Sequence, residues 1–233
     1  MKNLPYLKQK NGNWVWDFPS ELNMAVQACD YWVSKSPEKV CLKDFTNIDQ
    51  PILYTYKELR SFADSIAFEL TKRGVGIGDR VGVLLSQGIG CAASHIAIWK
   101  LGAISIPLFK LFGPDALKMR LNDAQAKCTI TDFEGSNSLL PNEFDRLIFD
   151  DIENTGEPFK TQSTKADTPA VLIYTSGTTG SPKGALHSQQ ILTGHLPGVS
   201  MSHNYLGHDR DCLWTPADWA WICLLYTSPS PRD

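Results

Sequence analysis

Residues 170–184 read Ala-Val-Leu-Ile-Tyr-Thr-Ser-Gly-Thr-Thr-Gly-Ser-Pro-Lys-Gly, and this stretch joins an apolar run to a glycine-rich loop. The run from Ala170 to Tyr174 follows Pro169 and is bounded on its other side by glycines, a pattern typical of a buried strand. A loop that leaves a strand at its carboxyl end lies where open α/β sheets place their ligands. The stretch therefore predicts a strand-to-loop ligand site in an α/β fold.

The loop after this strand has the composition of an anion site. Gly177 and Gly180 have no Cβ, so the backbone there can adopt left-handed conformations and approach a ligand closely. Successive inward-pointing amides form a concave anion site, and Lys183 adds a point charge of the kind that binds polyphosphates. Four hydroxyl side chains supply further donors: Thr175, Ser176, Thr178 and Thr179. We therefore interpret the segment as a phosphate-binding loop.

Two other interpretations compete with this one. Flexible linkers are also rich in serine, threonine and glycine. However, a flexible linker is not expected directly between an apolar strand and a Pro-Lys-Gly turn. The common P-loop requires glycine, four residues, and then Gly-Lys followed by serine or threonine. Counted from Gly177, the second glycine position holds Pro182, and Gly184 follows the lysine. The spacing therefore excludes the Walker type of P-loop.

Patterns of helix and strand alternate along the chain before the loop. The clearest helix runs from Tyr56 to Arg73, because Thr55 and Glu58 form a capping box, apolar residues recur at three- and four-residue steps, and Gly74 follows. Further strands are predicted at 81–85, 103–107, 128–131 and 147–150, with helices at 21–35, 89–101 and from 114 onward. The alternation predicts an α/β fold with a doubly wound, mostly parallel sheet.

The remaining segments carry weaker patterns. Short strands at 40–43 and 52–54 are expected to form a hairpin. Residues 1–36 are rich in tryptophan and irregular before the helix, and we expect the indoles at positions 14, 16 and 32 to pack against other residues. Polar and turn residues dominate positions 134–169, which indicates an excursion along the surface before the loop.

Composition excludes several classes of protein. A net charge of −3 over 233 residues provides no basic surface for nucleic acid. The amino terminus has no apolar signal region, and no stretch is long enough to span a bilayer, so we expect a cytoplasmic protein. Reduced thiols are expected because no C-x-x-C pair or metal-like spacing with histidine occurs among the six cysteines, which stand at positions 29, 41, 91, 128, 212 and 223.

The string from Tyr174 to Gly184 resembles, at every position, the signature phosphate loop of the adenylate-forming superfamily. This superfamily includes acyl-CoA synthetases, adenylation domains of peptide synthetases and firefly-type luciferases. Other blocks similar to its large amino-terminal domain are Gly74–Val81, Lys100–Pro107 and Thr215–Ile222. Together with Leu111–Pro114, the last block is more similar to acetyl- and medium-chain acyl-CoA synthetases than to peptide-synthetase domains. The resemblance implies an incomplete amino-terminal domain over residues 1–222.

The resemblance also implies an AMP-forming acid–thiol ligase of fatty acid metabolism. In such an enzyme a carboxylic acid attacks the α-phosphorus of ATP, giving an acyl-adenylate and pyrophosphate, and CoA then displaces AMP to give the thioester. ATP, Mg²⁺ and CoA are therefore the implied cofactors and partners. Phosphate contacts are expected from Thr175, Ser176, Gly177, Thr178, Thr179, Gly180 and Lys183. Thr175 is also the expected contact to Mg²⁺.

Three residues near the end of the resemblance lie where the acyl pocket begins in this superfamily: Asp218, Trp219 and Trp221. Substrate contact and packing within the pocket wall are equally good interpretations of the two tryptophans. His187 follows the loop and could approach the nucleotide, although an ordinary hydrogen-bonded histidine is more common at such a position. The other histidines form no arrangement with serine or cysteine that would indicate a triad.

The carboxyl end departs from the superfamily pattern. Residues 223–233 read Cys-Leu-Leu-Tyr-Thr-Ser-Pro-Ser-Pro-Arg-Asp, where glycines and another apolar stretch are expected. This string resembles the translation of a sequencing adapter, so we expect it to be non-native and the native chain to be cut near Ile222. The superfamily's Thr-Glu metal motif, ribose-binding aspartate, hinge and catalytic lysine would then lie beyond the cut. We expect no catalytic residue within this chain, and an inactive fragment.

Two other functions stay open at this point. A peptide-synthetase adenylation domain shares the loop but activates amino acids and passes them to a carrier arm. A non-catalytic nucleotide-binding protein would bind ATP without forming an adenylate.

Overall fold

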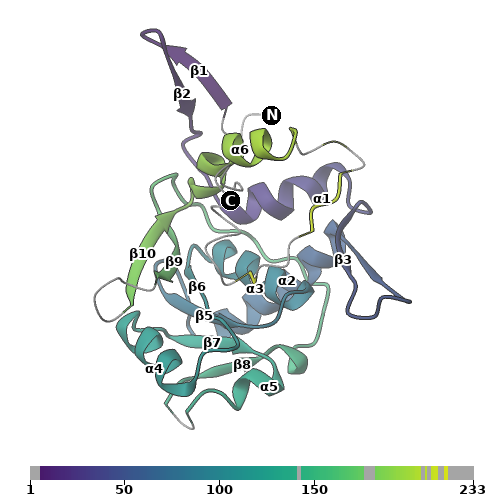
Figure 1. Cartoon of the computed structure of the whole chain (residues 1–233), viewed down its shortest axis with the longest axis vertical. Coiled ribbons are helices and arrows are strands. Elements are labelled where there is room, and N and C mark those ends of the chain that lie inside the picture. Colours follow the sequence, from purple (N-terminus) through teal and green to yellow (C-terminus); the bar gives the residue numbers. More distant parts are fainter. Residues whose placement is uncertain are drawn as a thin grey trace, which may run out of the picture.

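The computed structural model describes residues 6–140, 143–175, 182–205, 208, 211–214 and 218–219. Its largest sheet has the strand order β10-β9-β6-β5-β7-β8 (Figure 1). The strands are β5 (Arg80–Leu84), β6 (Ile104–Pro107), β7 (Cys128–Thr131), β8 (Arg146–Ile148), β9 (Pro169–Thr175) and β10 (Lys183–Ser188). Neighbouring strands are parallel from β9 across to β8, whereas β10 is antiparallel to β9. The prediction of a doubly wound, mostly parallel sheet is therefore confirmed.

Helices cover both faces of this sheet. Helices α2 (Tyr56–Lys72) and α3 (Ile89–Lys100) pack on one face, where they share an apolar cluster with Val81 and Val83. Helix α4 (Pro114–Asp123) packs on the other face against Leu84. Alternate side chains of β5 are therefore buried on opposite faces, which is why this central strand is apolar without a polar side.

Gly82, in the middle of β5, is required by close packing. A Cβ at this position would lie 2.9 Å from Thr129 Oγ1 and 3.0 Å from methyl groups of Leu108 and Leu121. Side chains of β7, of α4 and of the residue that follows β6 fill the space that a larger residue would need. The glycine thus allows α4 to approach the sheet closely.

Helix α2 forms as its local sequence predicts. The Thr55 hydroxyl accepts a hydrogen bond from the Glu58 amide at 3.2 Å, and the Glu58 carboxylate accepts one from the Thr55 amide at 2.7 Å. This reciprocal pair satisfies two amides that the first helical turn would leave unpaired. Gly74 follows the helix with a φ of +71°, so the predicted stop signal is confirmed.

Two hairpins lie outside the large sheet. Strands β3 (Val40–Asp44) and β4 (Ile52–Thr55) pair antiparallel, as predicted. The amino-terminal hairpin of β1 (Tyr6–Lys10) and β2 (Asn13–Asp17) was not predicted, and it projects away from the sheet at the top of the view (Figure 1). Its turn is Asn11-Gly12, with φ of 51° and 80°. Trp14 on β2 is 67% exposed, so the expectation that this indole packs was wrong.

Other elements differ from the prediction in detail. The helical segment predicted at 21–35 begins at residue 24 and contains a π turn, η1 (Val26–Asp30), before α1 (Tyr31–Lys35). The strand predicted at 147–150 ends earlier, and a 3₁₀ turn, η2 (Phe149–Asp151), follows it. Two short or irregular helices were not predicted: α5 (Phe133–Ser136) and α6 (Ile191–Ser202), which contains Pro197.

The segment of residues 154–164, here called the strap, runs without helix or strand across α2 and α3 towards β9. Most of its residues are exposed, as predicted, but polar contacts hold it along its length. These contacts join the Ser61 hydroxyl to Asn154, the Thr155 amide to Ser65, the Thr161 hydroxyl to Asp30, the Gln162 amide to the Lys100 carbonyl, and the Thr164 hydroxyl to the Leu22 carbonyl.

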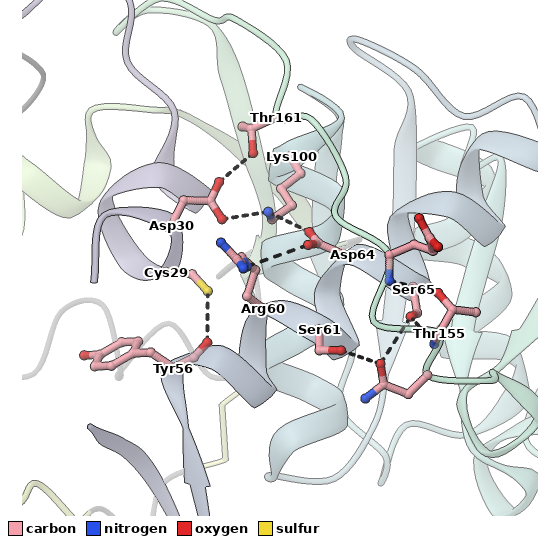
Figure 2. Close-up of polar contacts among 12 residues, drawn as sticks. Cys29, Asp30, Tyr56, Arg60, Ser61, Asp64, Ser65, Lys100, Thr155 and Thr161 are labelled. Carbon is pink, nitrogen blue, oxygen red and sulfur yellow. Dashed lines mark hydrogen bonds and ion pairs between the residues drawn. The ribbon is translucent and has the colours of Figure 1, made fainter. Parts of the chain in front are cut away.

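A buried ion cluster lies beneath the strap. The Lys100 ammonium, at the end of α3, is 2.7 Å from carboxylate oxygens of both Asp30 and Asp64 (Figure 2). Asp30 also accepts the Thr161 hydroxyl at 2.6 Å, and the Arg60 guanidinium is 3.9 Å from Asp64. One lysine thus joins the amino-terminal helical segment, α2, α3 and the strap.

The structure bears on two further expectations, the absence of a membrane span and the reduced state of the cysteines, within the described residues. No helix in the described ranges is long and apolar enough to cross a membrane. The five cysteines within those ranges are free thiols, and burial raises the pKa of Cys29, Cys91 and Cys128 to about 12. Residues 223–233, including Cys223, lie outside the described residues, so their proposed non-native origin stays a prediction.

Candidate phosphate-binding site

The two strands that flank the predicted loop are described: β9 ends at Thr175 and β10 begins at Lys183 (Figure 1). Because β5, β6, β7 and β9 are parallel, their carboxyl ends lie along one edge of the sheet, which includes the end of β9. Ligands bind at this position in open α/β sheets. The predicted strand at 170–174 is confirmed as β9, although it extends from Pro169 to Thr175.

Two of the predicted phosphate ligands are described, and the hairpin brings them together. Thr175 ends β9, Lys183 begins β10, and the two are register partners. The Thr175 hydroxyl contacts the Lys183 carbonyl oxygen at 3.5 Å. Lys183 is exposed, so its ammonium is accessible to a ligand in solution. The other predicted ligands, Ser176, Gly177, Thr178, Thr179 and Gly180, lie outside the described residues.

The stem of the loop carries a contact that local sequence did not indicate. The Tyr174 hydroxyl donates a hydrogen bond of 2.6 Å to the Asp123 carboxylate, at the end of α4. Burial raises the pKa of Tyr174, and its contact with Asp123 raises it further, so the phenol keeps its proton as a donor. The two residues are 51 positions apart, and neither helix nor strand periodicity predicts such a pair.

A second charged group at the same edge was also not predicted. Lys110, which follows β6, contacts Glu134 at 2.6 Å and Asp132 at 3.0 Å. Burial lowers the pKa of Lys110, but its hydrogen bonds to these carboxylates outweigh burial and raise the pKa above its ordinary value. The ammonium is therefore already neutralised by two carboxylates from the segment after β7.

His187 lies on β10, three residues after Gly184 in the same strand. Burial lowers its pKa, and the neighbouring charge of His195 on α6 lowers it further. Burial likewise lowers the pKa of His195. Both imidazoles are therefore held towards the neutral form, and the approach of His187 to a nucleotide stays a prediction.

Trp219 lines a separate cavity of about 490 Å³, and Asp218 precedes it in the chain. Trp219 is partly buried against the apolar cluster of α2 and α3, and the negative charge of Asp218 adds to the burial that raises the pKa of Cys91. The wall of the cavity also includes Gln87 and Gly88, which follow β5, and the exposed Trp214. The cavity therefore borders the carboxyl edge of the sheet. Trp221 lies outside the described residues.

In the described ranges, no group of three or more histidine, cysteine, aspartate or glutamate side chains is arranged to hold a metal ion. The Thr175 hydroxyl is a single oxygen donor at the end of β9. Mg²⁺ typically takes one or two protein ligands and completes its shell with substrate phosphates and water. A magnesium contact at Thr175 fits this pattern and stays a prediction.

Comparison with known proteins identifies the family. The pattern of the family described as "AMP-binding enzyme" matches residues 29–228. The acetyl-coenzyme A synthetase of Penicillium chrysogenum is 28% identical over an alignment of 251 residues, which covers 91% of this chain and 37% of that protein. The acetyl-coenzyme A synthetase of Bradyrhizobium diazoefficiens is 32% identical over 203 residues, covering 72% of this chain and 31% of that protein.

Solved structures show the same fold. The acyl-CoA synthetase of Brucella canis superposes with a TM-score of 0.74 at 23% identity, over 89% of this chain and 40% of that chain. The fatty acyl-adenylate ligase of L. pneumophila, solved with acyl adenylate and pyrophosphate, has a TM-score of 0.70 at 21% identity, over 78% and 33% of the two chains. The chain spans 37% and 31% of the two acetyl-coenzyme A synthetases, and it belongs to the AMP-binding enzyme family.

Proposed function

We propose that this chain is part of an AMP-forming acid–thiol ligase, which activates a carboxylic acid with ATP and transfers the acyl group to CoA. The observation that carries the proposal is the hairpin register of Thr175 and Lys183 at the carboxyl edge of the sheet. This register places a hydroxyl and an ammonium on the two sides of the loop with the superfamily's signature sequence. The two relatives compared by sequence above are acetyl-coenzyme A synthetases, which supports a short carboxylic acid as the substrate class.

In the proposed reaction, the loop binds the β- and γ-phosphates of ATP. Lys183 offsets their negative charge, and the loop amides and hydroxyls orient them, because adenylyl transfer depends mostly on positioning and charge stabilisation. Mg²⁺, when bound beside Thr175, would offset further phosphate charge. A carboxylate oxygen of the acid then bonds to the α-phosphorus while the bond to pyrophosphate breaks. CoA thiolate subsequently forms the thioester, and AMP leaves.

We place Asp218, Trp219 and Trp221 at the beginning of the acyl pocket. The cavity bordered by Trp219 supports this assignment, because it is lined partly by apolar side chains and opens beside the end of β5. We propose that the catalytic lysine lies outside these residues, that residues 1–222 form a partial amino-terminal domain, and that the chain alone does not complete the reaction.

ATP–pyrophosphate exchange tests the proposal. The protein encoded by the complete gene should exchange label when acetate or a medium-chain carboxylic acid is present, while the chain described here should give background signal. Exchange that depends on amino acids instead would identify a peptide-synthetase adenylation domain. ATP binding without exchange under any acid would identify a non-catalytic nucleotide-binding protein. Turnover by the chain alone would contradict the proposed location of the catalytic lysine.

A further inference from the structure

The hydrogen bond between Tyr174 and Asp123 ties helix α4 to the stem of the phosphate loop. Tyr174 directly precedes Thr175, and its hydroxyl is 2.6 Å from Asp123 Oδ2. Asp123 is the last residue of α4 and is exposed. An exposed hydrogen bond contributes little to global stability. We therefore expect the Tyr174–Asp123 hydrogen bond to affect the position of the loop stem more than the stability of the domain.

Arg120 reinforces this contact from one helical turn earlier in α4. Its guanidinium carbon lies 4.0 Å from the centre of the Phe112 ring and 6.0 Å from the centre of the Tyr174 ring. The side chain is largely buried, and it donates a hydrogen bond of 2.8 Å to the Ala116 carbonyl. The cation is thus fixed between two aromatic faces, an arrangement that attracts both rings. The Tyr174 ring is held by the arginine while its hydroxyl is held by the aspartate.

The same ring also covers the second strand of the stem. Gly184 on β10 is the register partner of Tyr174. A Cβ on Gly184 would lie 2.9 Å from Leu172 Cδ1 and 3.5 Å from two atoms of the Tyr174 ring. Because Gly184 has no side chain, the Tyr174 ring has room to lie across β10.

Strand alternation places the predicted phosphate ligands on the other side of the stem. Successive side chains of a strand point to opposite faces of the sheet, so Thr175 and Lys183 face away from Tyr174 and Gly184. Helix α4 therefore contacts the stem on the face of Tyr174, and Thr175 and Lys183 lie on the other face. We infer that Asp123 is a positioning residue for the phosphate loop, acting through Tyr174 to fix the two strand ends from which Thr175 and Lys183 project.

This inference rests on the proposed function, because it assigns Asp123 a role only if the loop binds phosphate. The informative variants are Asp123→Ala, which removes the acceptor, and Asp123→Asn, which retains an acceptor oxygen. Glu143→Gln is the matched control, because it weakens the 2.7 Å ion pair of Lys118 on the same helix. The readouts are amide hydrogen exchange at 173–175 and 183–185, the dissociation constant for ATP, and urea unfolding, all on the wild-type protein encoded by the complete gene and on its variants.

We expect Asp123→Ala to accelerate exchange in the stem and to weaken ATP binding about fivefold to tenfold, the equivalent of one lost hydrogen bond. Asp123→Asn should recover most of the affinity, and Glu143→Gln should match the wild type in both readouts. The urea midpoint of Asp123→Ala should change little, which separates positioning from global destabilisation. If that variant does not fold, Tyr174→Phe removes only the hydroxyl and decides by the same criteria.

The outcomes separate this inference from the proposed function. Unchanged stem exchange and ATP affinity in Asp123→Ala, beside a wild type that binds ATP, would overturn the inference alone. Weaker ATP binding that tracks a lower urea midpoint and is not recovered by asparagine would also overturn it. No ATP binding by the wild-type protein encoded by the complete gene would overturn both the inference and the proposed role of the loop.

Discussion

The Lys100 ammonium lies 2.7 Å from a carboxylate oxygen of Asp64, and the two side chains are only 1% and 3% exposed. Burial raises the pKa of the Asp64 carboxyl, whereas the contact with Lys100 lowers it. The second contact of the ammonium, with Asp30, connects this buried pair to the strap (Figure 2). Removing two charges from water is costly, and the cost is offset only while both partners are present. The cluster therefore makes the domain depend strongly on one lysine.

Lys100→Met should lower the free energy of unfolding by about 3–5 kcal/mol, because it leaves the buried Asp64 carboxylate without its closest cation. Urea denaturation of the purified chain measures the change. Lys57→Met is the control, since the Lys57–Glu38 ion pair is exposed and such pairs contribute about 0–1 kcal/mol. Equal effects of the two substitutions would show that the buried cluster does not contribute as the geometry indicates.

Gly82→Ala should destabilise the fold by about 1–3 kcal/mol, because overpacking forces neighbouring side chains to shift. The added Cβ would lie 2.9 Å from Thr129 Oγ1, closer than such atoms ordinarily approach. At Gly76, by contrast, an added Cβ would meet no atom within 4 Å, so Gly76→Ala is the matched control. Thermal unfolding distinguishes the pair. A Gly82→Ala variant as stable as the wild type would mean that α4 can move away from β5 at no cost.

Acid should destabilise the chain through His95. Burial lowers the pKa of this histidine from 6.5 to about 4, and its Nδ1 has no hydrogen-bond partner among the described residues. The unfolded chain therefore binds a proton at a higher pH than the folded chain does. The stabilising contribution is complete above pH about 6.5 and is lost as the pH falls towards about 4, at most about 3 kcal/mol.

Urea unfolding at several pH values between 4 and 7 measures this loss. The His95→Gln variant should have a shallower dependence of stability on pH over the same range, because it removes the titrating group. A wild type and variant with the same slope would assign the acid sensitivity to other groups. Comparing slopes rather than absolute stabilities keeps the test independent of any packing change caused by the substitution.

Local signals account for the elements that the sequence predicts well. Helix α2 has its capping box, its apolar stripe and its stop signal within one continuous segment, and β9 is an apolar run between clear boundaries. Strand β10 is different, because Lys183–Ser188 mixes charged, small and polar residues. It forms a strand because it pairs with β9. The residue preferences of Lys183–Ser188 alone therefore do not predict this strand.

Non-local contacts limit what could be predicted of the site. The signature loop could be found from its glycine spacing, hydroxyls and lysine, all within a few residues. The contacts of Tyr174 with Asp123 and of Lys100 with Asp30 join residues 51 and 70 positions apart, so they depend on the finished fold. The Asn11-Gly12 turn is a contrasting case. It is a strong local hairpin signal, so the first hairpin could have been predicted from residues 6–17 alone.

In the protein encoded by the complete gene, Lys183→Ala should weaken ATP binding by about 1.5–3 kcal/mol, because the substitution removes a charge-assisted bond to phosphate. Lys183 is exposed at the start of β10, so the domain should remain folded and the loss should be confined to the ligand. Lys165→Ala removes another exposed lysine, one that lies before β9 instead of in the stem, and should retain wild-type affinity. Titration of each variant with ATP at fixed ionic strength gives the dissociation constants. Equal affinities in the two variants would mean that the phosphates bind elsewhere, and the function proposed for the loop would then have no support.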